Sequence, residues 1–196
     1  MRPEDLADPL AVVTRWMEEG KETEPNDHDA MALATVSPDG RPSVRMVLLK
    51  SWDARGFVFY TNKESRKGLE LLATGRAAGV VHHKSKRRQL RIEGAVEELT
   101  DAESDAYFAT RARTSCLGAW ASLQSQPMVG RFDFEKRLAE VTARYALGPV
   151  PRPPHWGGFR IRAESIEFWE DRAFRLHLRF VCRSTADGWA VTELYP

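Results

Sequence analysis

The sequence has few cysteines: only Cys116 and Cys182 occur in 196 residues, and they lie far apart without the CxxC spacing of a redox or zinc motif. Free thiols in a reducing, cytoplasmic setting are therefore expected. For Cys116 we expect a small buried side chain, with a reactive thiol as the alternative.

Long hydrophobic runs and an excess of charge of one sign are also absent. No stretch approaches membrane-spanning length, and no signal-peptide core opens the chain. The formal net charge of +1 provides no general field that would attract nucleic acid or an acidic membrane. The basic run from Lys84 to Arg88 is explained more simply as a solvated turn or a site for one local anion. We expect neither a nucleic-acid nor a membrane partner.

Several motifs that carry chemistry are missing. The chain has no GxGxxG, HExxH or GxSxG, which disfavours a Rossmann domain, a zinc protease and a serine hydrolase. His82 and His83 are adjacent in a predicted strand, so their side chains point to opposite faces and make a poor chelating pair. No metal site is expected.

Short alternating segments separated by turn residues dominate the chain and predict an α+β fold with an antiparallel sheet or barrel. Residues 1–196 are expected to form a single domain, with an N-terminal helix and loop in 1–28 and C-terminal strands in 151–196. The predicted strands cover 31–36, 43–50, 57–61, 77–83, 89–99, 159–161, 165–169, 175–182 and 189–194. Helices are predicted over 9–20, 64–73, 100–111, 115–123 and 134–145, the last with a core face of Phe134, Leu138, Val141 and Tyr145.

The most informative local feature is a basic pair, Arg66 and Lys67, just after Ser65 at the start of the 64–73 helix. Cations are unfavourable at a helix N-terminus, where free N–H groups already favour an anion. The pair therefore indicates a ligand phosphate, and a solvated basic pair is the alternative.

Eight motifs occur in one order along the chain and together resemble the pyridoxamine 5′-phosphate oxidase family from about Asp8 to Pro196. They are Arg45-x-Val-Leu-Leu-Lys50, Phe59-Tyr-Thr-Asn62, Ser65-Arg-Lys67, Arg88-Gln89, Gly118-Ala-Trp-Ala-Ser-x-Gln-Ser125, Pro151-Arg-Pro-Pro-His-Trp-Gly-Gly158, Glu167-Phe-Trp169 and Arg175-Leu-His177. The resemblance implies an antiparallel split β-barrel (FMN-binding split barrel) with surrounding helices, forming a homodimer with two FMN sites at its interface.

The resemblance also implies which residues bind FMN, several of them from the partner subunit. Arg66 and Lys67 would hold the FMN phosphate, and residues 45–50 would form a strand alongside the cofactor. The implied cofactor residues are Arg45, Met46, Val47, Leu48, Leu49, Lys50, Tyr60, Thr61, Arg66, Lys67, Gln89, Gln124, Ser125, Trp169 and Arg179. Taken alone, a mid-strand Trp169 is more simply a core residue.

For the substrate, the resemblance implies that Lys50, Tyr107, Arg111 and Ser115 bind the phosphate of a vitamin B6 compound. Tyr107 and Arg111 are four residues apart and share a helix face, where a surface stacking contact is the simpler reading of the pair alone. Arg175 and His177 are the implied catalytic residues and would also contact the substrate. On a strand they would alternate with Leu176 and so share a face. Taken alone, an Arg-x-His pair of this kind is usually part of a solvated strand face.

Four departures from the family pattern bear on the substrate more than on FMN. Leu178 replaces an acidic residue beside the catalytic pair, Ala112 replaces a proline, His83 replaces an aromatic residue, and the N-terminal segment lacks the Arg and Tyr that cover the substrate in some relatives.

The leading hypothesis is FMN-dependent oxidation of pyridoxamine 5′-phosphate and pyridoxine 5′-phosphate to pyridoxal 5′-phosphate, with O2 as acceptor and H2O2 as product. One alternative is a flavin oxidase of the same fold that serves phenazine-type metabolism. Another is a non-catalytic carrier of flavin or pyridoxal phosphate.

Overall fold

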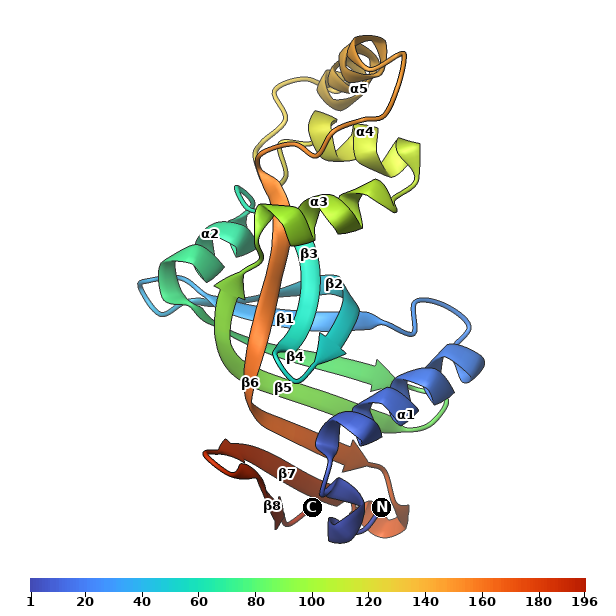
Figure 1. Ribbon diagram of the computed structural model, residues 1–196, viewed down its shortest axis with the longest axis vertical. Coiled ribbons are helices and arrows are strands. Elements are labelled where there is room, and N and C mark those ends of the chain that lie inside the picture. Colours follow the sequence, from blue (N-terminus) through green and yellow to red (C-terminus); the bar gives the residue numbers. More distant parts are fainter.

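The computed structural model describes all 196 residues and is built around one antiparallel sheet (Figure 1). Its eight strands run in the order β3-β2-β1-β4-β5-β6-β7-β8, and an additional β3–β6 pairing closes the first six into a barrel. The predicted α+β antiparallel barrel is confirmed. The strands are β1 (Ala30–Val36), β2 (Pro42–Asp53), β3 (Gly56–Asn62), β4 (Arg76–His83), β5 (Arg88–Glu98), β6 (Trp156–Glu170), β7 (Leu178–Thr185) and β8 (Gly188–Glu193).

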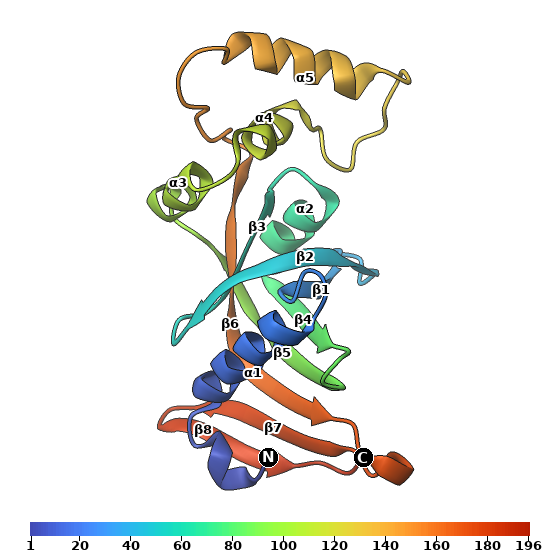
Figure 2. The ribbon, with the colours of Figure 1, turned by 90° about the vertical axis from the view of Figure 1, so that its right-hand side faces the viewer.

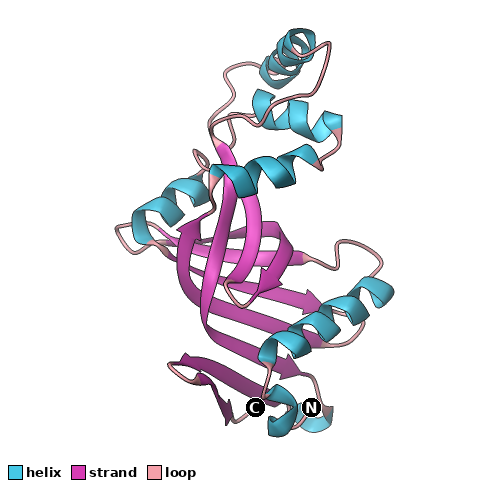
Figure 3. Ribbon diagram, viewed as in Figure 1, coloured by secondary structure: helices cyan, strands magenta, loops and turns pink.

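The helices lie around the barrel at both of its ends (Figure 3). They are α1 (Pro9–Thr23), α2 (Arg66–Thr74), α3 (Asp101–Ala109), α4 (Arg113–Ala121) and α5 (Asp133–Arg144), with 3-10 turns η1 (Pro3–Leu6) and η2 (Ala173–Arg175). Helices α3, α4 and α5 gather at one end, whereas η1, α1 and the β7–β8 hairpin lie toward the other, near both termini (Figure 2). None of the helices is long and apolar enough to cross a membrane.

Local signals in the sequence start and stop the helices where expected. The Asp8 carboxylate accepts hydrogen bonds from the amides of Leu10 and Ala11 and so caps α1. Thr100 and Glu103 form the reciprocal bonds of a capping box at α3. Gly75 ends α2 in the left-handed conformation, at φ 63°.

The core fills the barrel interior and the space under α1. It contains 20 buried residues, among them the fully buried rings of Phe57, Phe59, Phe159, Phe168 and Phe180. Strand β1 alternates between half-buried and buried positions, so one of its faces packs inward. Burial of each large apolar side chain contributes about 1.5–3 kcal/mol, which holds the strands in register around this core.

Three sequence predictions are wrong in detail. Residues 159–161 and 165–169 belong to one strand, β6, because no glycine or proline interrupts the chain between them and the polar residues there point outward. The predicted strand 175–182 begins only at Leu178, since residues 173–175 form a 3-10 turn with Phe174 and Arg175 at positive φ. On α5, only Val141 is buried, with Leu138 and Tyr145 packed beside it, whereas Phe134 is exposed.

Strand β6 connects the two ends of the molecule. It pairs with β3 and β5 inside the barrel and continues to pair with β7 below it, so the β7–β8 hairpin extends the sheet beyond the closed part (Figure 1).

Candidate active site

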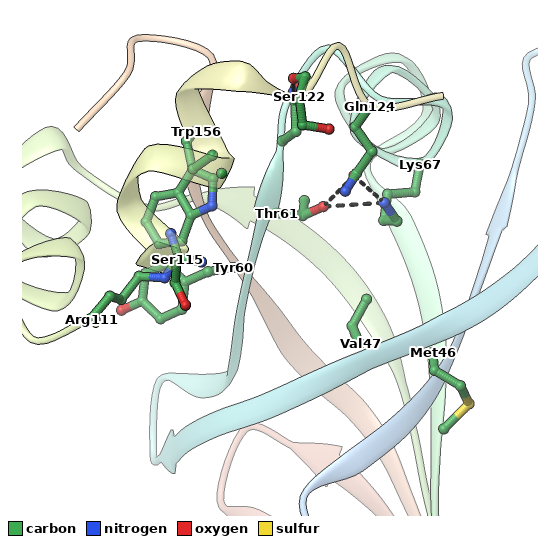
Figure 4. A pocket seen from close by; sticks show the side chains of 13 residues that line it. Met46, Val47, Tyr60, Thr61, Lys67, Arg111, Ser115, Ser122, Gln124 and Trp156 are labelled. Atoms are coloured by element: carbon green, nitrogen blue, oxygen red, sulfur yellow. Dashed lines mark hydrogen bonds between the residues drawn. The ribbon is translucent and has the colours of Figure 1, made fainter. Parts of the chain in front are cut away.

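A polar cavity of about 380 Å³ opens where the end of β3 meets α2 and α4 (Figure 4). Tyr60 and Thr61 are neighbours on β3, so their side chains point to opposite sides of the strand. Figure 4 shows Lys67 and Gln124 on the Thr61 side, and Arg111, Ser115 and Trp156 on the Tyr60 side. The lining residues are Met46, Val47, Tyr60, Thr61, Asn62, Lys67, Arg111, Ser115, Gly118, Ala119, Ser122, Gln124 and Trp156.

Lys67 is a buried cation in this cavity without a carboxylate partner. The Ser65 hydroxyl caps α2 by accepting from the Gly68 amide, which places Lys67 in the first helical turn as predicted. Its Nζ donates to Gln124 Oε1 at 2.7 Å, Thr61 Oγ1 at 3.2 Å and Ser65 Oγ at 3.3 Å, all neutral acceptors. Burial, and then the nearby charge of Arg45, lower the pKa of Lys67 to about 8. A bound anion would offset both effects by stabilising the ammonium form, so the site favours an anion.

Beside Lys67, two arginines are held by one buried carboxylate, Glu70. Arg66 Nε donates to Glu70 Oε1 at 2.9 Å, and Arg45 Nη2 lies 3.4 Å from Oε2. Burial opposes ionisation of Glu70, but hydrogen bonds from Ser43, Thr35 and Arg66 outweigh it and lower the pKa of Glu70 to about 2. Sequence reasoning missed Glu70, although its spacing four residues after Arg66 was a signal for this contact.

The charges of this group match a phosphate. The group contains three cations, Arg45, Arg66 and Lys67, and one carboxylate, Glu70, which pairs with the two arginines, so two net positive charges remain. A phosphate monoester carries about −1.5 to −2 at neutral pH and would balance them.

A second cavity, of about 340 Å³, adjoins the first and shares Tyr60, Arg111, Ser115 and Trp156 with it. All four residues expected to bind the substrate phosphate line this second cavity, namely Lys50, Tyr107, Arg111 and Ser115. They come from β2, α3, the α3–α4 turn and α4, so only the fold brings them together.

Arg111 has the environment of an anion-binding residue. Its Nη1 is buried without a hydrogen-bond partner, and its guanidinium lies over the rings of Trp156 (4.7 Å) and Phe108 (5.4 Å). Tyr107 stacks on Tyr60 at 3.9 Å between ring centroids, and the two rings form part of the lining of the second cavity beside Arg111. An unpartnered buried N–H costs free energy, and a bound phosphate oxygen would recover it.

Comparison with known proteins identifies the family of this chain. Residues 17–145 match the family model described as pyridoxamine 5′-phosphate oxidase, and residues 156–196 match the pyridoxine 5′-phosphate oxidase C-terminal dimerisation region. The chain belongs to the pyridoxamine 5′-phosphate oxidase family.

Relatives within this family cover almost the whole chain. The chain is 60% identical over 194 residues to the pyridoxine/pyridoxamine 5′-phosphate oxidase of Rhodospirillum rubrum, covering 96% of each protein. It is 58% identical over 190 residues to the protein of the same name from Gluconobacter oxydans, covering 97% of this chain and 95% of the relative.

Solved structures show the same fold. The crystal structure of PhzG from Burkholderia lata, in complex with tetrahydrophenazine-1-carboxylic acid, is 33% identical with a TM-score of 0.90 and covers 97% of this chain and 93% of its own. An FMN-binding protein from Nostoc punctiforme, related to pyridoxamine 5′-phosphate oxidase, is 16% identical with a TM-score of 0.76 and covers 95% of this chain and 96% of its own. The latter supports the split-barrel fold alone.

A second group of predicted site residues lies on or next to β5, β6 and β7, and all of them except Gln89 fall within the family's dimerisation region. Gln89, Trp169 and Arg179 lie opposite one another on β5, β6 and β7, and the His177 ring lies 4.7 Å from Trp169. Arg179 Nε donates to Glu167 Oε1 at 2.9 Å. None of these residues lines either cavity. One chain of this oxidase family member therefore carries two separate halves of the predicted site.

The chain places three of the predicted cofactor residues in different surroundings. Gln89 pairs across the sheet with Trp169. Gln124, in the segment after α4, contacts Lys67 within the same chain. Ser125, at φ 72°, faces a separate cavity with the loop before α5.

Residues 45–50 lie in a strand, as expected, but their side chains face different cavities or the core. Met46 and Val47 line the first cavity, and Leu48 and Lys50 line the second. Leu49 is 1% exposed in the barrel core, so only its backbone can face a ligand. Lys50 Nζ is paired with Asp29 at 2.6 Å.

The structure explains one departure from the family pattern, at His83, and locates a second, at Ala112. His83 is buried against Gly20 of α1, where a Cβ would come within 2.4 Å of the ring, and its Nε2 lies 2.8 Å from the His28 carbonyl. A smaller ring with a polar nitrogen fits this position. Ala112 is the N-cap residue of α4 and provides no side-chain cap. Cys116 is buried, as expected.

Proposed function

We propose that this protein oxidises pyridoxine 5′-phosphate and pyridoxamine 5′-phosphate to pyridoxal 5′-phosphate, with FMN as cofactor and O2 as electron acceptor. Family membership and the names of relatives at 56–60% identity support the reaction. The observation that carries the proposal is the pair of adjoining cationic cavities that share Arg111. A phosphorylated cofactor and a phosphorylated substrate require two such sites side by side.

FMN fits the first cavity better than FAD would. Lys67 lines this cavity, and Arg45 and Arg66 lie beside it on Glu70, so the group carries two net positive charges, which suits a terminal dianion. When bound, FMN supplies the acceptor for the hydride that leaves C4′ of the substrate, and dioxygen takes up the electrons as hydrogen peroxide. The protein supplies position and electrostatics.

The substrate phosphate is assigned to the second cavity. Arg111 would donate its unpartnered Nη1, Ser115 its hydroxyl and Lys50 its charge, while Tyr107 closes the wall. Anchoring at this end holds the pyridine ring near the cofactor and lowers the entropic cost of reaching the reactive geometry. Arg175 and His177 would orient and polarise the ring.

The two alternatives are less well supported. PhzG is the 33% identical structure, but relatives nearly twice as similar are named for vitamin B6 phosphates. A substrate without phosphate would leave the buried Arg111 Nη1 unpartnered. A non-catalytic carrier would not require the proposed catalytic residues Arg175 and His177.

The decisive experiment is anaerobic reduction of the purified protein by its substrate. The protein should be yellow with bound FMN and should bleach on addition of pyridoxine 5′-phosphate. Yellow protein that does not bleach would favour another substrate or a carrier, and colourless protein that binds no added FMN would contradict the cofactor assignment.

Dimerisation should complete the site. Outward-facing Val44, Met46 and Leu48 form an apolar row on β2 and are 69%, 61% and 38% exposed in the single chain. Sedimentation at micromolar concentration should give a homodimer, and Val44→Asp should raise the monomer fraction and lower flavin content. Leu72→Asp, at an exposed apolar position on α2, is the matched control. A monodisperse, flavin-loaded monomer of the parent protein would contradict the shared site.

Arg175→Ala should lower kcat/KM by about 2 kcal/mol, roughly 30-fold, because it removes a cation near a ring whose charge changes during reaction. FMN affinity and the dimer should be unchanged, since Arg175 lies in the exposed η2 turn away from the phosphate group. Steady-state kinetics with pyridoxine 5′-phosphate test this, and parent-like efficiency would show that Arg175 has no role in turnover.

A further inference from the structure

The turn that joins β6 to β7 contains a carboxylate–imidazole pair. Asp171 Oδ1 lies 2.9 Å from His177 Nδ1, and the two side chains are 13% and 22% exposed. The pair spans residues 171–177, so the 3-10 turn η2 and the positive φ angles of Phe174 and Arg175 bring its ends together. This contact could not be read from a strand prediction.

Asp171 is itself held from the other side. Arg87, in the β4–β5 turn, forms an ion pair with Asp171 Oδ2, and the Asp171 amide donates to the Arg87 carbonyl at 3.0 Å. One carboxylate oxygen thus faces Arg87 and the other faces His177. Arg87 therefore holds the carboxylate in position independently of its contact with His177.

The geometry selects one tautomer of His177. The Arg172 amide also lies near Nδ1, at 3.4 Å, and would require Nδ1 to be an acceptor. The carboxylate contact is 0.5 Å shorter and charge-assisted, so Nδ1–H donates to Asp171. Nε2 then remains free for the substrate, and the ring packs 4.7 Å from Trp169.

We propose that Asp171 is a positioning residue that fixes the ring orientation and tautomer of His177, in place of the acidic residue that the family pattern has at position 178. Leu178 packs against the barrel core, so position 178 faces away from the imidazole contact. The carboxylate comes instead from the preceding turn. This inference rests on the proposed role of His177 in turnover.

The test combines side-chain NMR with kinetics. In ¹⁵N spectra of the flavin-loaded dimer, taken at a pH where the ring is neutral, His177 should be protonated at Nδ1, with its signal assigned by comparison with His177→Gln. Asp171→Ala should shift the population toward the Nε2–H tautomer. It should also lower kcat with pyridoxine 5′-phosphate by at least about tenfold, the worth of a charge-assisted hydrogen bond, while FMN content stays at the parent level.

Two further variants serve as controls for the effect of Asp171→Ala. Arg87→Ala removes the other anchor of Asp171 but leaves its carboxylate, so it should retain the Nδ1–H tautomer and lose less activity. Asp187→Asn, in the exposed β7–β8 turn, is the matched control and should behave as the parent. If Asp171→Ala does not fold, Asp171→Asn replaces it, because the amide keeps the shape and removes the charge.

An unchanged His177 tautomer, or parent-like kcat in a folded Asp171 variant, would overturn the positioning role. A parent protein inactive on pyridoxine 5′-phosphate would instead overturn the proposed function, and the NMR measurement would still decide whether Asp171 sets the tautomer.

Discussion

Replacing Arg66 and Lys67 together with alanine should lower FMN affinity by at least about 100-fold, since each charge-assisted hydrogen bond is worth ~1.5–3 kcal/mol. Lys67 accounts for more of this loss than Arg66, because it is buried with only neutral partners, whereas Arg66 is already paired with Glu70. Titration of the apoprotein with FMN, followed by flavin fluorescence, measures the change.

Riboflavin and a matched lysine make this result specific to the phosphate. Riboflavin lacks the phosphate, so the double variant should bind it about as well as the parent does. Lys63→Ala removes a nearby lysine that is paired with Glu98 and does not line the cavity, so FMN binding should be preserved. Equal losses for FMN and riboflavin would contradict the phosphate assignment.

The pH dependence of FMN affinity provides a second test of the role of Lys67. The pKa of Lys67 is lowered to about 8, so the ammonium is present below that pH and is lost as the pH rises through it. FMN affinity of the parent should therefore fall above about pH 8, with proton uptake on binding. The double variant should lose this dependence.

Arg111→Ala should lower kcat/KM for pyridoxine 5′-phosphate by about 2–5 kcal/mol, chiefly through KM, because truncating one partner of a buried charged contact costs about that much. The Nη1 of Arg111 is buried without a partner in the protein and is therefore open to a phosphate oxygen. Steady-state kinetics with pyridoxine 5′-phosphate and with unphosphorylated pyridoxine should show that the preference for phosphate is reduced.

Two arginine controls separate charge from geometry. Arg111→Lys keeps the charge but loses the planar fork and its stacking over Trp156, so it should recover only part of the efficiency. Arg113→Ala removes the arginine two positions later, which donates to the Tyr145 and Gly148 carbonyls and lies outside the second cavity. It should keep the parent preference for phosphate. An unchanged KM in Arg111→Ala would place the substrate phosphate elsewhere.

Much of the local structure was predictable because it depends on neighbouring residues. Asp8, Thr100 with Glu103, and Gly75 mark helix ends through contacts within one turn. An antiparallel sheet or barrel followed from strand-length segments joined by short turns, and the family resemblance implied the split barrel. Ser65 placed Lys67 at a helix N-terminus, and with it the expectation of a phosphate.

Other features depended on residues far apart in the chain. Gln124 contacts Lys67 across 57 positions, and Gln89 lies with Trp169 only because β5 and β6 pair. The predicted catalytic pair, Arg175 and His177, was expected on a strand, but it lies in a turn where Asp171 contacts both Arg87 and His177. No local pattern encodes such a turn.

The sequence by itself determined the family, the helix caps, the barrel class and the identity of the cationic residues, since these follow from short-range geometry and from residue types in order. Tertiary structure alone decided that Glu70 also binds Arg45, that Arg111 lies between two cavities, and that the predicted site is divided within one chain. The physical reason is that burial, charge pairing and cavity shape are set by contacts between distant segments, which strand pairing and core packing bring together.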